Sequence, residues 1–178
     1  MVESRRCARS LIERSMSTFL KMAVATVFAL SLLGQSACTG RYMQGDVIHS
    51  EAKIRNTSDN AEVVELVDTY RHAVEARDVD TLRSLVSRDY YENAGTTNTT
   101  DDDYGYEGLD NLFNILTHNV KETRLNLKVR DIRVYGDRAD VVFEYAYTML
   151  YTVGDTQRWQ TERDVNRFQL HKVDGVWL

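Results

Sequence analysis

The stretch Ala139-Asp-Val-Val-Phe-Glu-Tyr-Ala-Tyr-Thr-Met-Leu-Tyr151 is the clearest strand in this chain. It is dense in β-branched and aromatic residues, and both of its alternating faces carry apolar groups. One face holds Val141, Phe143, Tyr145, Tyr147 and Met149, and the other holds Val142, Ala146 and Leu150. This pattern is typical of a central strand that is covered on both sides.

Two further long strands flank this one. Residues Leu125–Val134 alternate, but the apolar residues change parity near Arg130-Asp131, which predicts a β-bulge. Turns are predicted at Gly136-Asp137 and at Gly154-Asp155. Trp159–Lys172 is the third predicted strand, and a last turn at Asp174-Gly175 leads into the short apolar end of the chain. The last third of the sequence therefore predicts consecutive antiparallel strands.

Helical periodicity precedes the strands. Residues 60–76 show the i, i+3, i+4, i+7 spacing of one apolar face, and Asp59 with Glu62 has the offset of a capping box. Asp78 is the expected cap of a second, shorter helix. After a predicted short strand at 90–92 and a long loop, a third helix is expected over 110–120, with four residues facing inward: Leu112, Phe113, Leu116 and Val120.

Length and charge bound the possible classes of protein. The chain has 178 residues, which suits one compact domain. Its net charge is −5, and residues 38–178 hold 17 Lys and Arg against 25 Asp and Glu, a balance of −8. An acidic domain argues against nucleic acid as a partner, because neutralising phosphates requires clustered Lys and Arg.

The first 37 residues are predicted to be a secretory signal peptide. A basic flank precedes the uncharged apolar run Ala23–Leu33, which is too short for the roughly 20 residues of a membrane-spanning helix. Translation starting at Met16 would give a leader of more ordinary length. The following Ser36-Ala37-Cys38 resembles the bacterial lipoprotein box, although Gln35 replaces the usual aliphatic residue.

The resemblance implies that Cys38 becomes the lipidated first residue of an envelope protein. It also implies a domain facing the periplasm, and Thr39 after the cysteine favours the outer membrane. The alternative is an ordinary secretory signal that leaves a free thiol. Because Cys7 lies in the leader, the mature chain would contain Cys38 alone and no internal disulfide.

Residues 38–58 are predicted to form a tether, and residues 59–178 the folded domain. The tether carries His49 close to Asp46 and Glu51, a weak metal-ligand pattern for which a solvated linker is the alternative interpretation.

The order of elements resembles the nuclear transport factor 2-like superfamily, and within it the SnoaL-like branch. The resemblance rests on Ala76-Arg-Asp78 leading into the second helix and on the Asp174-Gly-Val-Trp177 ending. It implies an α+β, cystatin-like fold in which three N-terminal helices pack on a strongly curved mixed or antiparallel sheet that forms a cone. The superfamily contains isomerases, dehydratases and cyclases as well as binding proteins, so the fold does not settle the activity.

Two sets of side chains are candidate sites. The loop Gly95–Gly108 is predicted to cross the mouth of the cone and to contact any ligand or ion, and its candidate residues are Asp101, Asp102, Asp103, Tyr104, Tyr106 and Glu107. Clustered carboxylates suit Ca²⁺, but the EF-hand spacing is absent and a solvated loop is the alternative, so no metal or other cofactor is assigned. Tyr104 and Tyr106 have apolar area to bury, which predicts that the loop is held against the domain.

The second set lies on the strands and comprises Asp164, Tyr145 and Tyr147. If its face lines the cone, Asp164 is a candidate general base; if it faces water, a salt bridge with a neighbouring Arg is expected. We expect a non-catalytic module that binds a small molecule or a protein partner, and that forms a homodimer. The alternative is a small-molecule isomerase, hydratase or cyclase acting in the cone.

Overall fold

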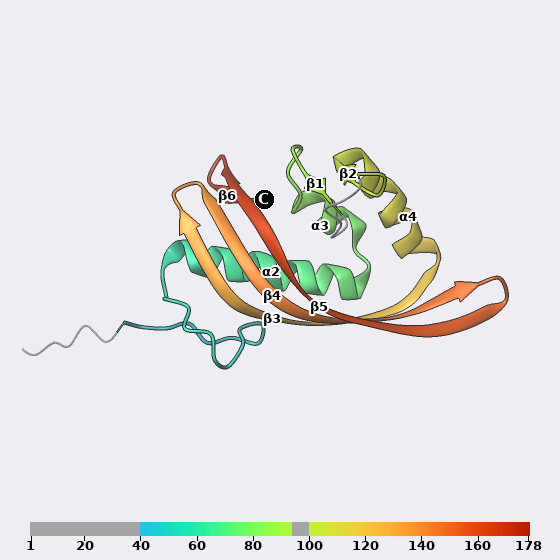
Figure 1. Ribbon diagram of the computed structural model, residues 1–178, viewed down its shortest axis with the longest axis horizontal. Helices are drawn as coiled ribbons and strands as arrows, with labels where there is room; N and C mark the ends of the chain where they lie inside the picture. The colour runs from blue at the N-terminus through green and yellow to red at the C-terminus, as the bar shows by residue number, and fades with distance from the viewer. Residues whose placement is uncertain (1–39, 94–99) are drawn as a thin grey trace, which may run out of the picture. The chain divides into compact units, whose positions relative to one another are not determined.

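The computed structural model describes residues 40–93 and 100–178 of the chain. The predicted leader, Cys38 and the first part of the predicted loop lie outside these residues. Residues 40–178 form one compact unit, in which three long strands curve around helix α2 (Figure 1). This is the α+β arrangement predicted from the sequence.

The sheet consists of β3 (Val120–Tyr135), β4 (Arg138–Val153), β5 (Thr156–Val173) and β6 (Val176–Trp177), in that order. Each strand is antiparallel to the next, and the central position predicted for β4 is confirmed. Its fully buried residues Ala139, Val141 and Phe143 all share one face, whereas Val142, Ala146 and Leu150 on the other face are half-buried. We call the first face, turned toward α2, the concave face, and the second the convex face.

The predicted β-bulge is confirmed. The register between β3 and β4 shifts between Val129 and Asp131, where the apolar residues of β3 change parity. The extra residue keeps Leu127 and Val129 before the bulge, and Ile132 after it, on the concave face. A second shift, between Val120 and Glu122, was not predicted.

Helix α2 (Ser58–Ala76) begins two residues earlier than the capping box suggested. Thr57 is the N-cap, and its hydroxyl accepts a hydrogen bond from the Asn60 amide at 3.2 Å. The predicted role of Asp59 is therefore wrong: Asp59 lies in the first turn and accepts from Lys172 Nζ at 2.9 Å. A tertiary partner on β5 accounts for its acidic side chain, which local spacing cannot reveal.

The other two helices lie where they were predicted, but one residue predicted to face inward is exposed. Helix α3 (Val79–Ser84) is capped by Asp78, which accepts from the Thr81 amide at 3.1 Å. Helix α4 (Leu109–His118) follows a 3₁₀ turn, η1 (Tyr106–Gly108), and buries Phe113. Leu112, predicted to face inward, is exposed, because α4 lies at the margin of the fold and buries only a narrow stripe.

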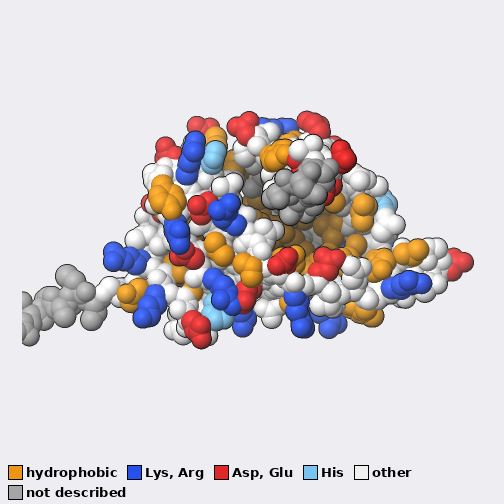
Figure 2. All heavy atoms as spheres, viewed as in Figure 1, with side chains coloured by type: hydrophobic (Ala, Val, Ile, Leu, Met, Phe, Trp, Pro, Cys, Tyr) orange, Lys and Arg blue, Asp and Glu red, His pale blue; other side chains and the backbone are white. Residues whose placement is uncertain are grey.

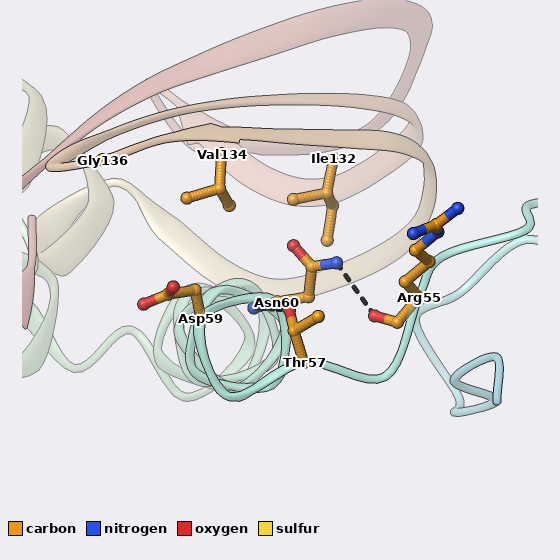
Figure 3. A pocket seen from close by; sticks show the side chains of 7 residues that line it. All are labelled: Arg55, Thr57, Asp59, Asn60, Ile132, Val134 and Gly136. Carbon is orange, nitrogen blue, oxygen red and sulfur yellow. Dashed lines mark hydrogen bonds between the residues drawn. The ribbon is translucent and has the colours of Figure 1, made fainter. Parts of the chain in front are cut away.

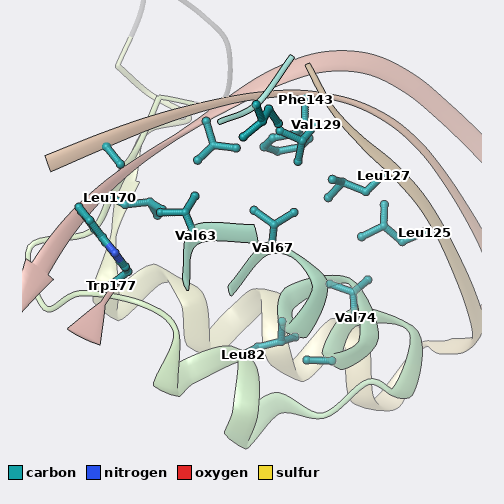
Figure 4. Packing of buried hydrophobic residues seen from close by; sticks show 14 of the residues in the cluster. Val63, Val67, Val74, Leu82, Leu125, Leu127, Val129, Phe143, Leu170 and Trp177 are labelled. Atoms are coloured by element: carbon teal, nitrogen blue, oxygen red, sulfur yellow. The ribbon is translucent and has the colours of Figure 1, made fainter. Parts of the chain in front are cut away.

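The hydrophobic core lies between α2 and the concave face. Val63 and Val67 of α2 and Val129 and Val141 of the sheet are completely buried. Figure 4 shows Val63 and Val67 of the helix on the side that faces Val129 and Phe143 of the sheet, with Trp177 of β6 at one end of the core. The periodicity predicted for α2 therefore supplies one wall of the core, and the alternation of the strands supplies the other.

The segment predicted as a tether packs on the domain. Val47 and Ile54 are buried, and Ile48 forms a parallel bridge with Val129. The Val129 amide donates to the Val47 carbonyl at 2.6 Å, and the His49 amide donates to the Val129 carbonyl at 2.8 Å. These bonds occupy edge groups of β3 that would otherwise be open to a strand of another molecule.

The C-terminal end of α2 covers another part of the same edge. Glu75 Oε1 accepts from the Leu125 amide at 3.0 Å, and the Thr123 hydroxyl donates to the Val74 carbonyl at 2.8 Å. The Arg77 guanidinium donates to the Val120 carbonyl at 2.7 Å. Helix and edge strand are thus joined by hydrogen bonds as well as by apolar contact.

The predicted short strand at 90–92 pairs with the second half of the predicted long loop in a small β-ribbon. β1 (Tyr91–Glu92) pairs antiparallel with β2 (Tyr104–Gly105), so the two ends of the loop meet. Gly108 lies where a Cβ would come within 2.6 Å of the Tyr104 Cβ, which leaves room for glycine alone at this contact. The ribbon holds Tyr104 in a defined place beside the core.

Candidate functional site

Half-buried aromatic side chains extend from the core across the concave face. Phe168 of β5 contacts Tyr70 of α2 edge-on, with ring centroids 5.1 Å apart, and Phe143 of β4 at 4.5 Å. Tyr145 continues the row, with its ring centroid 6.4 Å from that of Phe143. We define the tyrosine hollow by its half-buried aromatic residues, Tyr70, Tyr104, Tyr145, Tyr147 and Phe168. Figure 2 shows a hollow between β5 and the α3–α4 side, with hydrophobic side chains inside it and acidic ones at its rim.

Tyr70 is the innermost of these tyrosines. Burial raises the pKa of its hydroxyl to about 12, and the nearby Tyr147, Tyr104, Tyr145 and Glu92 act in the same direction. A raised pKa keeps this phenol protonated at neutral pH. Tyr70 therefore presents a neutral hydroxyl that can donate to, or accept from, a polar group of a ligand.

The β1–β2 ribbon contributes a polar corner to the same region. The Tyr90 hydroxyl donates to Glu92 Oε2 at 3.3 Å, and the rings of Tyr90 and Tyr104 are 6.2 Å apart. Burial raises the pKa values of both the Tyr90 and the Tyr104 hydroxyl, and the nearby Glu92 carboxylate acts in the same direction. The sequence analysis selected neither Tyr70 nor Glu92 for the site. Tyr70 lies in the apolar stripe of a helix and Glu92 in a very short strand, and neither position is distinctive in the sequence alone.

The predicted strand residues fall on the concave face but differ in burial. Tyr145 and Tyr147 lie within the hollow, and Tyr145 pairs directly with Asp164 across the β4–β5 ladder. Asp164 is on the face that also carries Phe168, yet it is exposed, and its Oδ1 accepts from the Val165 amide at 2.7 Å. Asp164 is thus an acidic group at the rim of the hollow.

The predicted acidic loop is brought partly against the domain. Tyr104 and Tyr106 both pack on the core, as the loop prediction requires, and Arg88 lies over the Tyr106 ring at 4.4 Å. Asp103 Oδ2 accepts from the Tyr91 hydroxyl, while Asp101, Asp102 and Glu107 are exposed. Asp103 is therefore joined to β1 through the Tyr91 hydroxyl.

Metal-binding geometry is not found in the part of the chain that the structure describes. In residues 40–93 and 100–178, no three His, Cys, Asp or Glu side chains are grouped so that they could hold an ion. His49, part of the weak pattern in the N-terminal segment, accepts from the Glu51 amide through Nδ1 at 3.2 Å. This local bond occupies Nδ1 of His49.

A separate open groove lies at the start of α2, with a volume of about 400 Å³. Its lining residues, shown in Figure 3, are Arg55, Thr57, Asp59, Asn60, Ile132, Val134 and Gly136. Asn60 donates through its side-chain amide to the Arg55 carbonyl at 2.9 Å, as the dashed line shows. The polar side chains at its centre are thus used in holding the entry to α2.

A transmembrane helix is also not found among the described residues: none of their helices has the length and apolarity to cross a bilayer.

Comparison with solved structures gives the fold. A nuclear transport factor 2-like superfamily protein from Salmonella enterica matches with a TM-score of 0.51 and 17% identity, over 68% of this chain and 87% of that one. A ketosteroid isomerase-like protein from Erwinia carotovora atroseptica matches with a TM-score of 0.53 and 14% identity, over 68% and 90% of the two chains. A type 2 hexachlorocyclohexane dehydrochlorinase gives a TM-score of 0.50 and 21% identity, over 67% and 79%. The predicted nuclear transport factor 2-like fold is confirmed.

Comparison of sequences gives the family. No curated protein matches the chain. The sequence model of the calcium/calmodulin dependent protein kinase II association domain matches residues 59–178, which include almost all of α2, the whole sheet and the tyrosine hollow. This chain therefore belongs to the calcium/calmodulin dependent protein kinase II association domain family.

Proposed function

We propose that this domain is a non-catalytic association module that pairs with a second copy of itself through the convex face. The observation that carries the proposal is the exposure of β5, whose residues 156–167 are exposed on both faces. Trp159 and Val165 lie on the convex side and are 52% and 54% exposed. Large apolar side chains exposed on one sheet face are typical of an interaction surface. The description of the family as an association domain supports this choice.

The charges of the convex face suit a twofold contact. Glu144 of β4 pairs with Arg130 of β3, while the exposed Arg163 and Arg167 of β5 lie on the same side of the sheet. In a twofold contact the same patch meets itself, so it must carry both signs of charge to be self-complementary. A face with apolar residues between acidic and basic ones meets that requirement.

Pairing through the face is favoured over pairing through the edge of β5. The Val165 amide donates to Asp164 Oδ1, and the Arg167 amide donates to Asn166 Oδ1, both at 2.7 Å. These two edge donors are already used within their own strand. Side-chain groups that occupy the edge hinder the addition of another strand.

Light scattering of the purified protein over a concentration series tests the association. We expect wild type to be dimeric and Val165→Lys to raise the dimer dissociation constant by at least about tenfold, because the change places charge in the contact. Val153→Lys is the control, since Val153 is 58% exposed but lies at the hairpin end on the concave parity. A wild-type monomer at 100 µM, or equal weakening by both variants, would contradict the proposal.

We also propose that Cys38 anchors the module to the cell envelope, where the domain faces the periplasm. The leader pattern and the Ser36-Ala37-Cys38 sequence support this location. Metabolic labelling with a clickable fatty acid in a bacterial host tests it. Wild type should be labelled and Cys38→Ala should not, and unlabelled wild type would leave an ordinary secretory signal as the explanation.

An isomerase, hydratase or cyclase acting in the hollow is the second candidate. The observation that favours it is the contact of the Glu92 carboxylate with the Tyr90 hydroxyl, beside the protonated Tyr70. A carboxylate next to phenol donors can transfer a proton while the phenols stabilise a developing oxyanion. An enzyme would convert a bound ligand, whereas an association module returns it unchanged, which NMR of the ligand after incubation distinguishes.

A further inference from the structure

The tyrosine hollow combines aromatic walls with an acidic rim, and it lies on the opposite side of the sheet from the proposed association face. Tyr145 pairs with Asp164, and Tyr147 pairs with Glu162, directly across the β4–β5 ladder. Directly opposed side chains on one face of an antiparallel pair lie about 5 Å apart at their Cβ atoms. Each of these two rings therefore has a carboxylate as its immediate neighbour.

The acidic side chains at the rim are held by local bonds that leave them charged. Glu162 Oε1 accepts from the Gln160 side chain at 2.7 Å, and Asp164 Oδ1 accepts from the Val165 amide. A neutral donor satisfies an oxygen but does not cancel the negative charge. Glu92 adds a third carboxylate on the ribbon side, in contact with Tyr90.

The basic side chains of β5 near the hollow point to the other face of the sheet, lie toward the hairpin end, or are paired with carboxylates. Strand alternation turns Arg163 and Arg167 to the convex face. Lys172, at the far end of the concave face, contacts both Asp59 and Glu62, at 2.9 and 2.8 Å. Arg158 shares the concave parity but lies four residues beyond Glu162, toward the hairpin end. On the β4–β5 side of the hollow, the charges nearest to the tyrosine rings are therefore the carboxylates of Glu162 and Asp164.

We propose that the tyrosine hollow binds an organic cation, namely an amine or quaternary ammonium group attached to an apolar body. The faces of tyrosine rings attract such cations through their quadrupoles, and a desolvated cation gains most from them. The rim carboxylates add attraction over a longer range and repel anions. The aromatic floor accepts the apolar body, and the Tyr70 hydroxyl offers it a hydrogen bond.

Isothermal titration with three small probes of similar size tests the proposal: benzyltrimethylammonium, neutral benzyl alcohol and benzoate. We expect benzyltrimethylammonium to bind at least about tenfold more tightly than benzyl alcohol, and benzoate to bind most weakly, because only the cation gains from ring faces and carboxylates together. No binding of benzyltrimethylammonium at millimolar concentration, or equal affinity for the cation and the alcohol, would overturn it.

The double variant Glu162→Gln/Asp164→Asn isolates the charge. It should weaken the binding of benzyltrimethylammonium by about tenfold and leave the affinity for benzyl alcohol unchanged. Weaker binding of both probes would indicate that the hollow itself is damaged. Asp137→Asn/Asp174→Asn is the matched control, since it removes the same two charges at exposed turns remote from the hollow. Equal weakening by both double variants would assign the preference to net charge and overturn the proposed site.

Discussion

Phe143→Ala is expected to destabilise the domain by about 3–5 kcal/mol, which is a large part of the total stability of an ordinary domain. Phe143 is 3% exposed and contacts Phe168 at 4.5 Å, where the core ends and the tyrosine hollow begins. Removing the ring leaves a cavity that the stiff central strand cannot close. Urea unfolding followed by circular dichroism measures the change.

The control for Phe143→Ala is Val153→Ala on the same strand. Val153 is 58% exposed at the end of β4, so its truncation should alter the free energy of unfolding by less than about 0.5 kcal/mol. If Phe143→Ala were no more costly than this control, the packing described for the concave face would be incorrect.

Ile54→Ala should lower the free energy of unfolding by about 2–5 kcal/mol, although Ile54 lies in the segment that was predicted to be a tether. Its side chain is 4% exposed, and its carbonyl accepts from the Met43 amide at 2.7 Å. The segment from Gly40 to Thr57 would then unfold together with the sheet whose edge it covers. Chemical unfolding of the variant measures this cost directly.

Tyr42→Ala is the matched control in the same segment, because Tyr42 is 54% exposed. It should change the free energy of unfolding by less than about 0.5 kcal/mol. A detached tether would instead make both substitutions nearly neutral, and that result would show that the contacts with Val129 contribute little to the folded state.

Much of the sheet could be predicted because its information is local. Alternation and residue type identify β4, glycine and aspartate mark the turns, and the change of parity near Arg130-Asp131 locates the bulge. Strands joined by short turns pair with their chain neighbours, so the strand order followed from the turn positions. The apolar stripe of α2 likewise identified the residues that reach the core.

The candidate site could be predicted only in part. Tyr145 and Tyr147 were selected because they lie on a recognisable strand, and both are in the hollow. Tyr70 and Glu92 join them from a helix and from a two-residue strand, 75 and 53 positions before Tyr145. No spacing rule connects elements so distant in the chain.

Local patterns of alternation, turn residues and helical spacing are sufficient to indicate the strands, the helices and the α+β class of this protein. The exposure of Leu112, the use of Asp59 by Lys172, the packing of residues 47–49 on β3 and the meeting of tyrosines with carboxylates all depend on contacts between distant segments. Those contacts exist because a curved sheet must bury its concave face and occupy the edge of β3, and whichever segments reach these places acquire partners there.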